Sequence, residues 1–365
     1  MLPNDYYFEP EEEAEESYPD FFYKWDQFLS NGQSVGYYES EDLSEIIEIY
    51  LDSNELEKAK KTIDYALETY PDDDDLIYGI LSLLNDYELW NDLLILSEHY
   101  QYLPEVWADG HRITALLHLG MEEDAFHFFG KMKTKYAENE DNLSIIYQAM
   151  AESLAEMDLF EAAINVMDEA LEVFGENADF YWIQLHSWIA AGCKEEAEII
   201  AERIASLSAF DGETWHRLGI MYFDLDEIVK AIDSFEFARN LGFGTKENLL
   251  NLIQSYEQNS NYEKALEIAK EYINLYPDAH LIYIIASNIS SLLERWKEAI
   301  GFLDQAIQRI PSLDSLYLCK SNYYLQLGEQ GKAKSALKEG IMQTQDPEGH
   351  LREELEKLND QDPEN

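Results

Sequence analysis

The sequence has few cysteines and no long apolar run. Its two cysteines, Cys193 and Cys319, cannot build a disulfide framework, and such scarcity is typical of a reducing compartment. We expect both thiols to be free. No segment reaches the roughly 18 apolar residues of a membrane-spanning helix. Residues 1–10 carry neither the basic residues nor the apolar stretch of a signal peptide. We therefore expect a cytoplasmic protein without a membrane partner.

Basic residues are also scarce. The chain has 25 Lys and Arg against 75 Asp and Glu, a net charge of −50. Residues 1–111 hold 29 acidic and four basic residues, so half of the charge lies in under a third of the chain. This charge repels nucleic acid and anionic lipid, and it attracts basic proteins. Two interpretations stay open: the acids keep an extended surface hydrated, or they steer a basic partner.

Catalytic and metal-binding motifs are missing. The sequence has no phosphate-binding G-x-x-x-x-G-K, no G-x-S-x-G, no H-E-x-x-H and no C-x-x-C. His111 and His118 share one helix face, but two turns separate them by about 10.5 Å, too far for one metal ion. Four adjacent acids at 72–75 lack the spacing of a calcium loop. We expect no enzyme, no cofactor and no metal site.

The clearest pattern lies in residues 212–245. Two sets of residues with helical spacing each share one face of a helix: Trp215, Leu218 and Tyr222, and then Ala231, Phe235 and Ala238. Gly219 has no side chain, so the two helices can approach closely. We expect Asp226 to cap the second helix and Trp215 to lie in the core between adjacent hairpins. One hairpin cannot bury its apolar face alone, so the pattern predicts neighbouring hairpins.

This segment resembles the 34-residue tetratricopeptide repeat, whose pattern is W-x2-L-G-x2-Y followed by A-x3-F. The pattern returns at a spacing of 34, and about nine repeats start near residues 40, 74, 106, 144, 178, 212, 246, 280 and 314. Residues 140–143 break the phase, and the exact phase of the repeats at 74 and 106 stays open. The resemblance implies an all-α, right-handed superhelical solenoid of helix-turn-helix repeats over 40–347.

Two segments flank the array. Residues 1–39 form an acidic tail with a predicted aromatic helix at 20–31, whose apolar stripe contains Phe21, Phe22, Trp25, Phe28 and Leu29. This helix either caps the first repeat or docks on a partner or in the groove of the protein itself. Residues 348–365 form a predicted capping helix and tail. Asp346 and Pro347 start that helix, and Leu351, Leu355 and Leu358 form its apolar stripe.

The resemblance also implies a concave groove, lined by the first helix of each repeat, that binds extended peptides. Counting the groove positions of the family gives Trp182, Ile183, His186, His216, Arg217, Gln254, Ile284, Ile285, Asn288, Leu318 and Asn322. Among them, Gln254, Asn288 and Asn322 recur every 34 residues, and their carboxamides suit the N–H and C=O groups of an extended backbone. Glu152 and Glu156 of the fourth repeat, with the acids of the first, make the groove acidic toward its N-terminal end.

We interpret the chain as a non-catalytic scaffold or adaptor that binds an extended peptide or protein segment in this groove. The alternative is an acidic chaperone or decoy that binds a strongly basic protein through surface charge. Salt distinguishes these hypotheses, because a complex held by charge weakens as ionic strength rises. Both hypotheses predict a protein partner, with basic partners favoured by the charge, and neither predicts nucleic acid.

Overall fold

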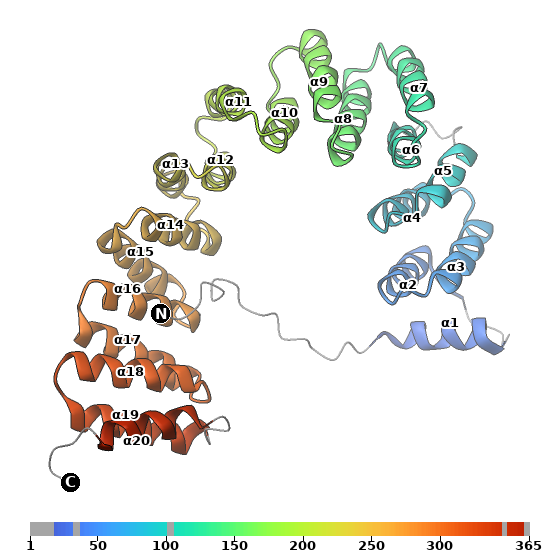
Figure 1. Ribbon diagram of the computed structural model, residues 1–365. Coiled ribbons are helices and arrows are strands. Elements are labelled where there is room, and N and C mark those ends of the chain that lie inside the picture. The colour runs from blue at the N-terminus through green and yellow to red at the C-terminus, as the bar shows by residue number, and fades with distance from the viewer. Residues whose placement is uncertain (1–17, 32–36, 101–105, 345–348, 361–365) are drawn as a thin grey trace. The chain divides into compact units, whose positions relative to one another are not determined.

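The protein is described from a computed structural model, which covers residues 18–31, 37–100, 106–344 and 349–360. In these residues the chain forms twenty α-helices and no β-strand, which confirms the predicted all-α solenoid of helical hairpins (Figure 1). Internal contacts divide the chain after Leu207 into two compact units. We call residues 18–207 the N-terminal unit and residues 208–360 the C-terminal unit.

The N-terminal unit contains one single helix and five hairpins. Their bounds are α1 Asp20–Asn31, α2 Ser40–Asp52, α3 Leu56–Thr69, α4 Asp74–Asp86, α5 Trp90–His99, α6 Val106–His118, α7 Glu122–Lys135, α8 Glu140–Glu156, α9 Phe160–Phe174, α10 Ala178–Ala190 and α11 Lys194–Leu207. Even-numbered helices are the first helices of the hairpins. They lie next to one another within this unit, on the inner side of its curve in Figure 1.

The C-terminal unit contains four hairpins and a last helix. Their bounds are α12 Gly212–Asp224, α13 Ile228–Asn240, α14 Lys246–Gln258, α15 Tyr262–Leu275, α16 Leu281–Leu292, α17 Trp296–Arg309, α18 Asp314–Gln326, α19 Gln330–Thr344 and α20 His350–Asp360. The alanines that recur in the second helices, such as Ala231, Ala265 and Ala299, have no exposed surface. Small side chains at these positions let the helices of each hairpin pack closely.

The phase break at 140–143 is an extra helical turn. These four residues form the start of α8, which is 17 residues long, whereas α6 and α10 have 13 residues each. Asn139 caps α8, because its side-chain oxygen accepts a hydrogen bond from the backbone N–H of Asn142 at 3.1 Å. The longer helix carries the acidic residues Glu152 and Glu156 near its C-terminal end.

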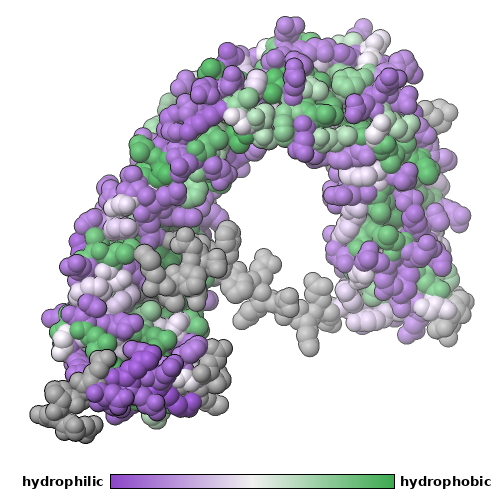
Figure 2. Space-filling model, viewed as in Figure 1, coloured by the Kyte–Doolittle hydropathy of each residue, from purple (hydrophilic) through white to green (hydrophobic). Residues whose placement is uncertain are grey.

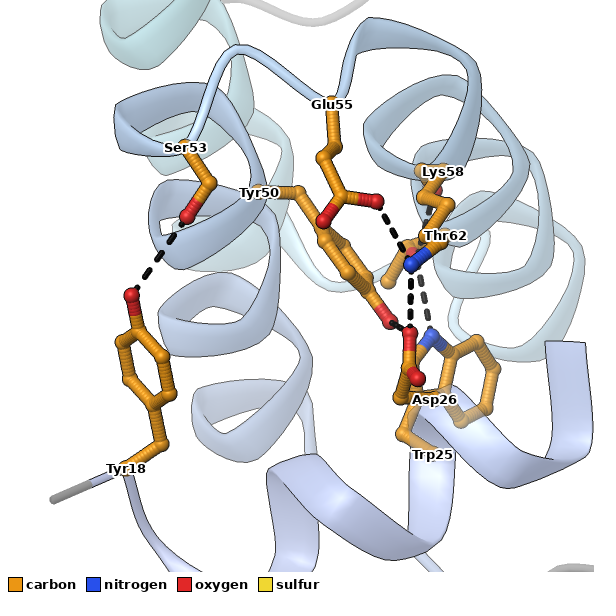
Figure 3. A network of polar contacts seen from close by, with 8 residues as sticks. All are labelled: Tyr18, Trp25, Asp26, Tyr50, Ser53, Glu55, Lys58 and Thr62. Carbon is orange, nitrogen blue, oxygen red and sulfur yellow. Dashed lines mark hydrogen bonds and ion pairs between the residues drawn. The ribbon is translucent and has the colours of Figure 1, made fainter. Parts of the chain in front are cut away.

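Helix α1 packs on the first hairpin. Trp25 is fully buried, and its indole Nε1 donates a hydrogen bond to Thr62 Oγ1 at 2.8 Å (Figure 3). Its ring also contacts Tyr38 and Tyr65, with centroids 5.2 and 4.8 Å away. Phe22 is buried against Tyr50, with ring centroids 5.1 Å apart. The aromatic stripe therefore covers the hairpin α2–α3 and leaves Trp25 unable to reach another protein.

A polar network holds the same helix in place. Lys58 Nζ lies 2.7 Å from Asp26 Oδ1 and 2.5 Å from Glu55 Oε2, and Tyr50 donates its hydroxyl proton to Asp26 at 3.0 Å (Figure 3). The hydrogen bond from Lys58 lowers the pKa of Asp26, with a smaller contribution from Tyr50. Burial raises the pKa of Tyr50. The ionised carboxylate of Asp26 thus joins α1 to both helices of the first hairpin.

Every hairpin turn contains a residue with a positive φ angle. Within the described residues there is one in each of the nine turns, always two residues after the first helix: Asn54, Glu88, Gly120, Asp158, Gly192, Asp226, Ser260, Glu294 and Gly328. Asp226 has a φ of 60°, and Glu227 occupies the N-cap position of α13, so the expectation that Asp226 caps this helix was wrong. The turn requires left-handed backbone at this position.

Trp215 also differs from its expected place. It is half-buried, its Nε1 donates a hydrogen bond to the carbonyl of Ala209 at 3.0 Å, and its ring lies 4.6 Å from that of Phe237. These contacts join α12 to the segment before it and to its own partner helix. The side chain therefore lies at the edge of one hairpin instead of in the core between two.

Helix α20 covers the last hairpin. Leu351 and Leu358 are buried and Leu355 is half-buried. Gly340 on α19 permits this packing, because a Cβ atom there would meet Tyr317 Cγ at 2.7 Å and Leu351 Cδ1 at 2.9 Å. Asp346 and Pro347, the expected start of the helix, lie outside the described residues.

Candidate binding surfaces on the first helices

Four of the predicted groove residues lie in the core. Trp182 and Ile183 on α10 are 7% and 9% exposed, and Ile284 and Ile285 on α16 are 1% and 5% exposed. In this conformation they have little surface to offer a ligand. Their packing stabilises the first helices.

His216 has a structural role. It is 9% exposed, and its Nδ1 lies 3.0 Å from Oδ1 of Asn248, a fully buried residue on the next first helix. Asn248 Nδ2 donates to the carbonyl of Phe235 at 3.1 Å, so its Oδ1 is the acceptor and the histidine is the donor. His216 thus connects α12 to α14. Its sequence neighbour Arg217 is exposed, as is His186 on α10.

The three carboxamides lie on successive first helices of the C-terminal unit. Gln254 on α14 and Asn288 on α16 are half-buried, and Asn322 on α18 is exposed. Leu318, one turn before Asn322, is half-buried. Within the described residues none of the three carboxamides makes a hydrogen bond, and Asn288 contributes only its backbone carbonyl, to Ser291 Oγ at 2.7 Å. Their donors and acceptors are therefore available to a ligand.

The N-terminal unit contains a cavity that the sequence analysis did not predict. Its volume is about 180 Å³, and residues from α4, α6 and α8 line it: Asn85, Trp107, Gly110, His111, Thr114, Ile145, Gln148, Ala149, Glu152, Ser153 and Glu156. Residues of α6 and α8 contribute most of the wall. Counting groove positions from the repeat starts at 106 and 144 gives several of these residues. The irregular phase of the repeat at 106 hid this pattern in the sequence.

Acidic side chains are prominent on the first helices of this unit. Glu41, Glu45, Glu48 and Asp52 are all exposed on α2. Hydrophilic residues also cover most of the surface visible in Figure 2, with smaller apolar areas between them. A ligand that approaches these helices therefore meets a negatively charged surface.

Other kinds of site are not found in the part of the chain that the structure describes. No three His, Cys, Asp or Glu side chains come close enough there to hold a metal ion. Cys193 and Cys319 are free and half-buried, and burial raises the pKa of the Cys319 thiol. None of the described helices is both long and apolar enough to cross a lipid bilayer.

Comparison with known proteins identifies the repeat and the fold. Residues 247–279, which contain α15 and all of α14 except its first residue, match the sequence model of the tetratricopeptide repeat. The search of curated proteins found no match. Among solved structures, the C-terminal part of a TPR repeat-containing protein from Cytophaga hutchinsonii has a TM-score of 0.50 and 15% sequence identity, and the match covers 69% of this chain and 98% of that one.

Two further structures match at lower similarity. YrrB, described as a TPR protein with an unusual peptide-binding site, has a TM-score of 0.41 and 16% identity, with 52% of this chain and 97% of that chain covered. MamA has a TM-score of 0.38 and 18% identity, with 44% and 95% covered. The repeat match at residues 247–279 and the Cytophaga structure support the predicted repeat architecture. The ligand of this chain is argued below from its own residues.

Proposed function

We propose that this chain, which carries tetratricopeptide repeats, is a non-catalytic scaffold that binds an extended protein segment on the first helices of its hairpins. The observation that carries this proposal is the row of unpaired carboxamides formed by Gln254, Asn288 and Asn322. The three residues recur every 34 positions, so they occupy equivalent places on α14, α16 and α18.

The chemistry of the row suits a backbone ligand. Each carboxamide offers both a donor and an acceptor, as each peptide group of an extended segment does. Contacts of this kind give affinity with little preference for sequence, and neighbouring side chains such as Leu318 then select among residues. Each hydrogen bond contributes about 0.5–1.5 kcal/mol net, so one substitution has a small effect.

The test is a triple substitution in the full chain. A peptide selected from a random display library against the wild-type protein serves as ligand, and calorimetric titration measures its affinity. Replacement of Gln254, Asn288 and Asn322 by Ala should weaken binding by several-fold to about a few hundredfold, since water compensates for part of the loss. Helical content should not change, because the three side chains hold no other part of the described fold.

The chain offers a matched control. Asn240, Asn274 and Gln308 also recur every 34 residues, but they are exposed near the C-terminal ends of the second helices α13, α15 and α17. Their replacement by Ala removes the same chemical groups and should leave affinity unchanged. Equal affinity of the first triple variant and the wild type would remove this row from the binding mechanism.

The alternative function, an acidic chaperone or decoy, predicts a different dependence of affinity on salt. Residues 1–111 carry 29 acids and four bases, which favours a basic partner held by charge. A complex of that kind should weaken steeply as the Debye length falls from about 10 Å at 0.1 M salt to about 3 Å at 1 M. A complex held by carboxamides should keep most of its affinity. Titration of the selected peptide at several salt concentrations separates the two.

A further inference from the structure

The cavity between α4, α6 and α8 has a fixed floor. Ser153 donates a hydrogen bond to Thr114 Oγ1 at 2.9 Å, and both residues are buried. A Cβ atom added to Gly110 would lie 3.4 Å from Cβ of Ala149, so α6 and α8 are in close contact here. This contact and hydrogen bond hold the cavity in shape before a ligand arrives. Its volume of about 180 Å³ exceeds the roughly 150 Å³ of an engineered cavity that binds benzene.

The aromatic rim of the cavity is exposed. Trp107 is 47% exposed and Tyr78 is 40% exposed, and their ring centroids lie 6.0 Å apart with an interplanar angle of 61°. Tyr78 also lies 6.4 Å from the ring of His111. An exposed tryptophan face attracts cations, and a planar cation gains further from stacking on it.

The cavity has negative charge without a counterion. Glu152 makes no ion pair or hydrogen bond within the described residues, and no Lys or Arg lines the cavity. Glu156 has one contact, from His118 Nε2 to its Oε2 at 3.1 Å. Burial lowers the pKa of His111, so this ring stays neutral near pH 7, and its buried Nε2 has no hydrogen-bond partner among the described residues.

We propose that this cavity receives the arginine side chain of a bound protein segment, stacked on Trp107 and hydrogen-bonded to Glu152 and Glu156. Its guanidinium group is planar and has five N–H donors, so it can stack on an aromatic ring while it serves two carboxylates. Glu152 and Glu156 are four residues apart on α8 and therefore lie on one helix face. A lysine ammonium is compact and lacks this planar surface.

The empty cavity is unfavourable for the carboxylate of Glu152. The surrounding protein raises the pKa of Glu152 by removing part of its hydration, and the charge of Glu156 raises it further. Glu152 is exposed, so this effect on the fold is small, and a cation bound beside the carboxylate would offset it. A carboxylate with a raised pKa, in a cavity with an aromatic rim, is typical of a binding position.

The experiment uses the full chain, labelled with 5-fluorotryptophan. The chain has seven tryptophans, and each gives a separate fluorine NMR signal. The Trp107→Phe variant assigns the signal of Trp107. Three capped amino acids are titrated: N-acetyl-arginine amide, N-acetyl-lysine amide and N-acetyl-citrulline amide, the last being a neutral analogue of arginine. The Trp107 signal should shift most with arginine, less with lysine and not with citrulline.

Two glutamate variants complete the test. Glu152→Gln should weaken arginine binding at least tenfold, whereas Glu172→Gln, an equal charge change at an exposed position on α9, should alter it less than twofold. The melting temperature of Glu152→Gln checks that the variant is folded. Equal shifts with all three amino acids would overturn the proposal, because the neutral citrulline would then bind as well as arginine. Equal losses in both variants would also overturn it and leave only an effect of net charge.

This inference rests on the proposed function only in taking the first helices as the ligand-facing side. The cavity lies in the N-terminal unit and the carboxamide row in the C-terminal unit. The arginine titration needs no peptide, so it can succeed where the triple alanine variant fails, and the reverse also holds.

Discussion

Replacement of glycine by alanine should change the free energy of unfolding in opposite directions at Gly219 and at Gly301, because only Gly219 is in close contact with another side chain. A Cβ atom at Gly219 on α12 would lie 2.5 Å from Cε1 and 2.6 Å from Cδ1 of Phe235, which is 1% exposed. Gly301 on α17 has no atom within 4 Å of the same added carbon. Both glycines are inside helices of the C-terminal unit, so replacement by Ala brings the same gain in helix propensity.

The magnitudes separate the two variants. Ala replaces Gly in a helix interior with a gain of about 0.5–1 kcal/mol, and Gly301→Ala should show this stabilisation in full. Overpacking of a buried ring costs about 1–3 kcal/mol, so Gly219→Ala should be destabilised in spite of that gain. The difference between the variants, about 1–3 kcal/mol, measures the contact with Phe235.

Urea unfolding followed by far-UV circular dichroism gives the midpoints, and equal slopes show that the same surface unfolds in each variant. Arrays of repeats lose all-or-none behaviour, so tryptophan fluorescence should follow the same transition before free energies are compared. The Phe235→Leu background tests the cause, because Gly219→Ala should cost less there. If Gly219→Ala stabilises the chain as much as Gly301→Ala, the packing argument is refuted.

Three further outcomes are expected. Glu294→Gly relieves a φ of 57° in the turn before α17 and should raise unfolding stability by up to about 1 kcal/mol in urea melts, whereas Gly328→Ala, at a φ of 72°, should lower it. Asp26→Asn should lower the thermal midpoint at pH 7. The pKa of Asp26 in the folded state is lowered from its ordinary value of 3.8. The difference between the variant and the wild type should therefore fade as the pH falls from 3.8 through the folded-state pKa. Glu152→Gln should raise the midpoint at pH 7, because the pKa of Glu152 is raised, and the gain should vanish below pH 4.5.

The repeat pattern was sufficient to predict the fold. Tyr256 and Ala265 keep the 34-residue spacing and are buried where that spacing requires, because each repeat packs in the same way on its neighbour. The conformation of the turns was not predicted. Asp226 has the side chain of a typical helix cap, but its backbone is left-handed, and side-chain type alone does not reveal which role applies.

The groove residues show a second limit of prediction from the sequence. Helices α10 and α16 are apolar around most of their circumference, so counting positions cannot tell which side meets solvent, and Ile284 and Ile285 were assigned to the surface. On α14 and α18, Gln254 is half-buried and Asn322 is exposed, so both have surface that a ligand can reach. The sequence did not indicate the cavity at Trp107, because about half of its wall comes from repeats whose phase the pattern left open.

The helices at the two ends of the array bear on self-assembly. A stack of similar hairpins has no intrinsic length, since the surface that ends one stack is built to receive the next hairpin. In this chain Trp25 of α1 fills the surface of the first hairpin, and Leu351 of α20 fills that of the last. Both helices carry acids on their outer sides, such as Asp20 and Glu353. Because these two surfaces are covered, we expect copies of the described array not to associate end to end.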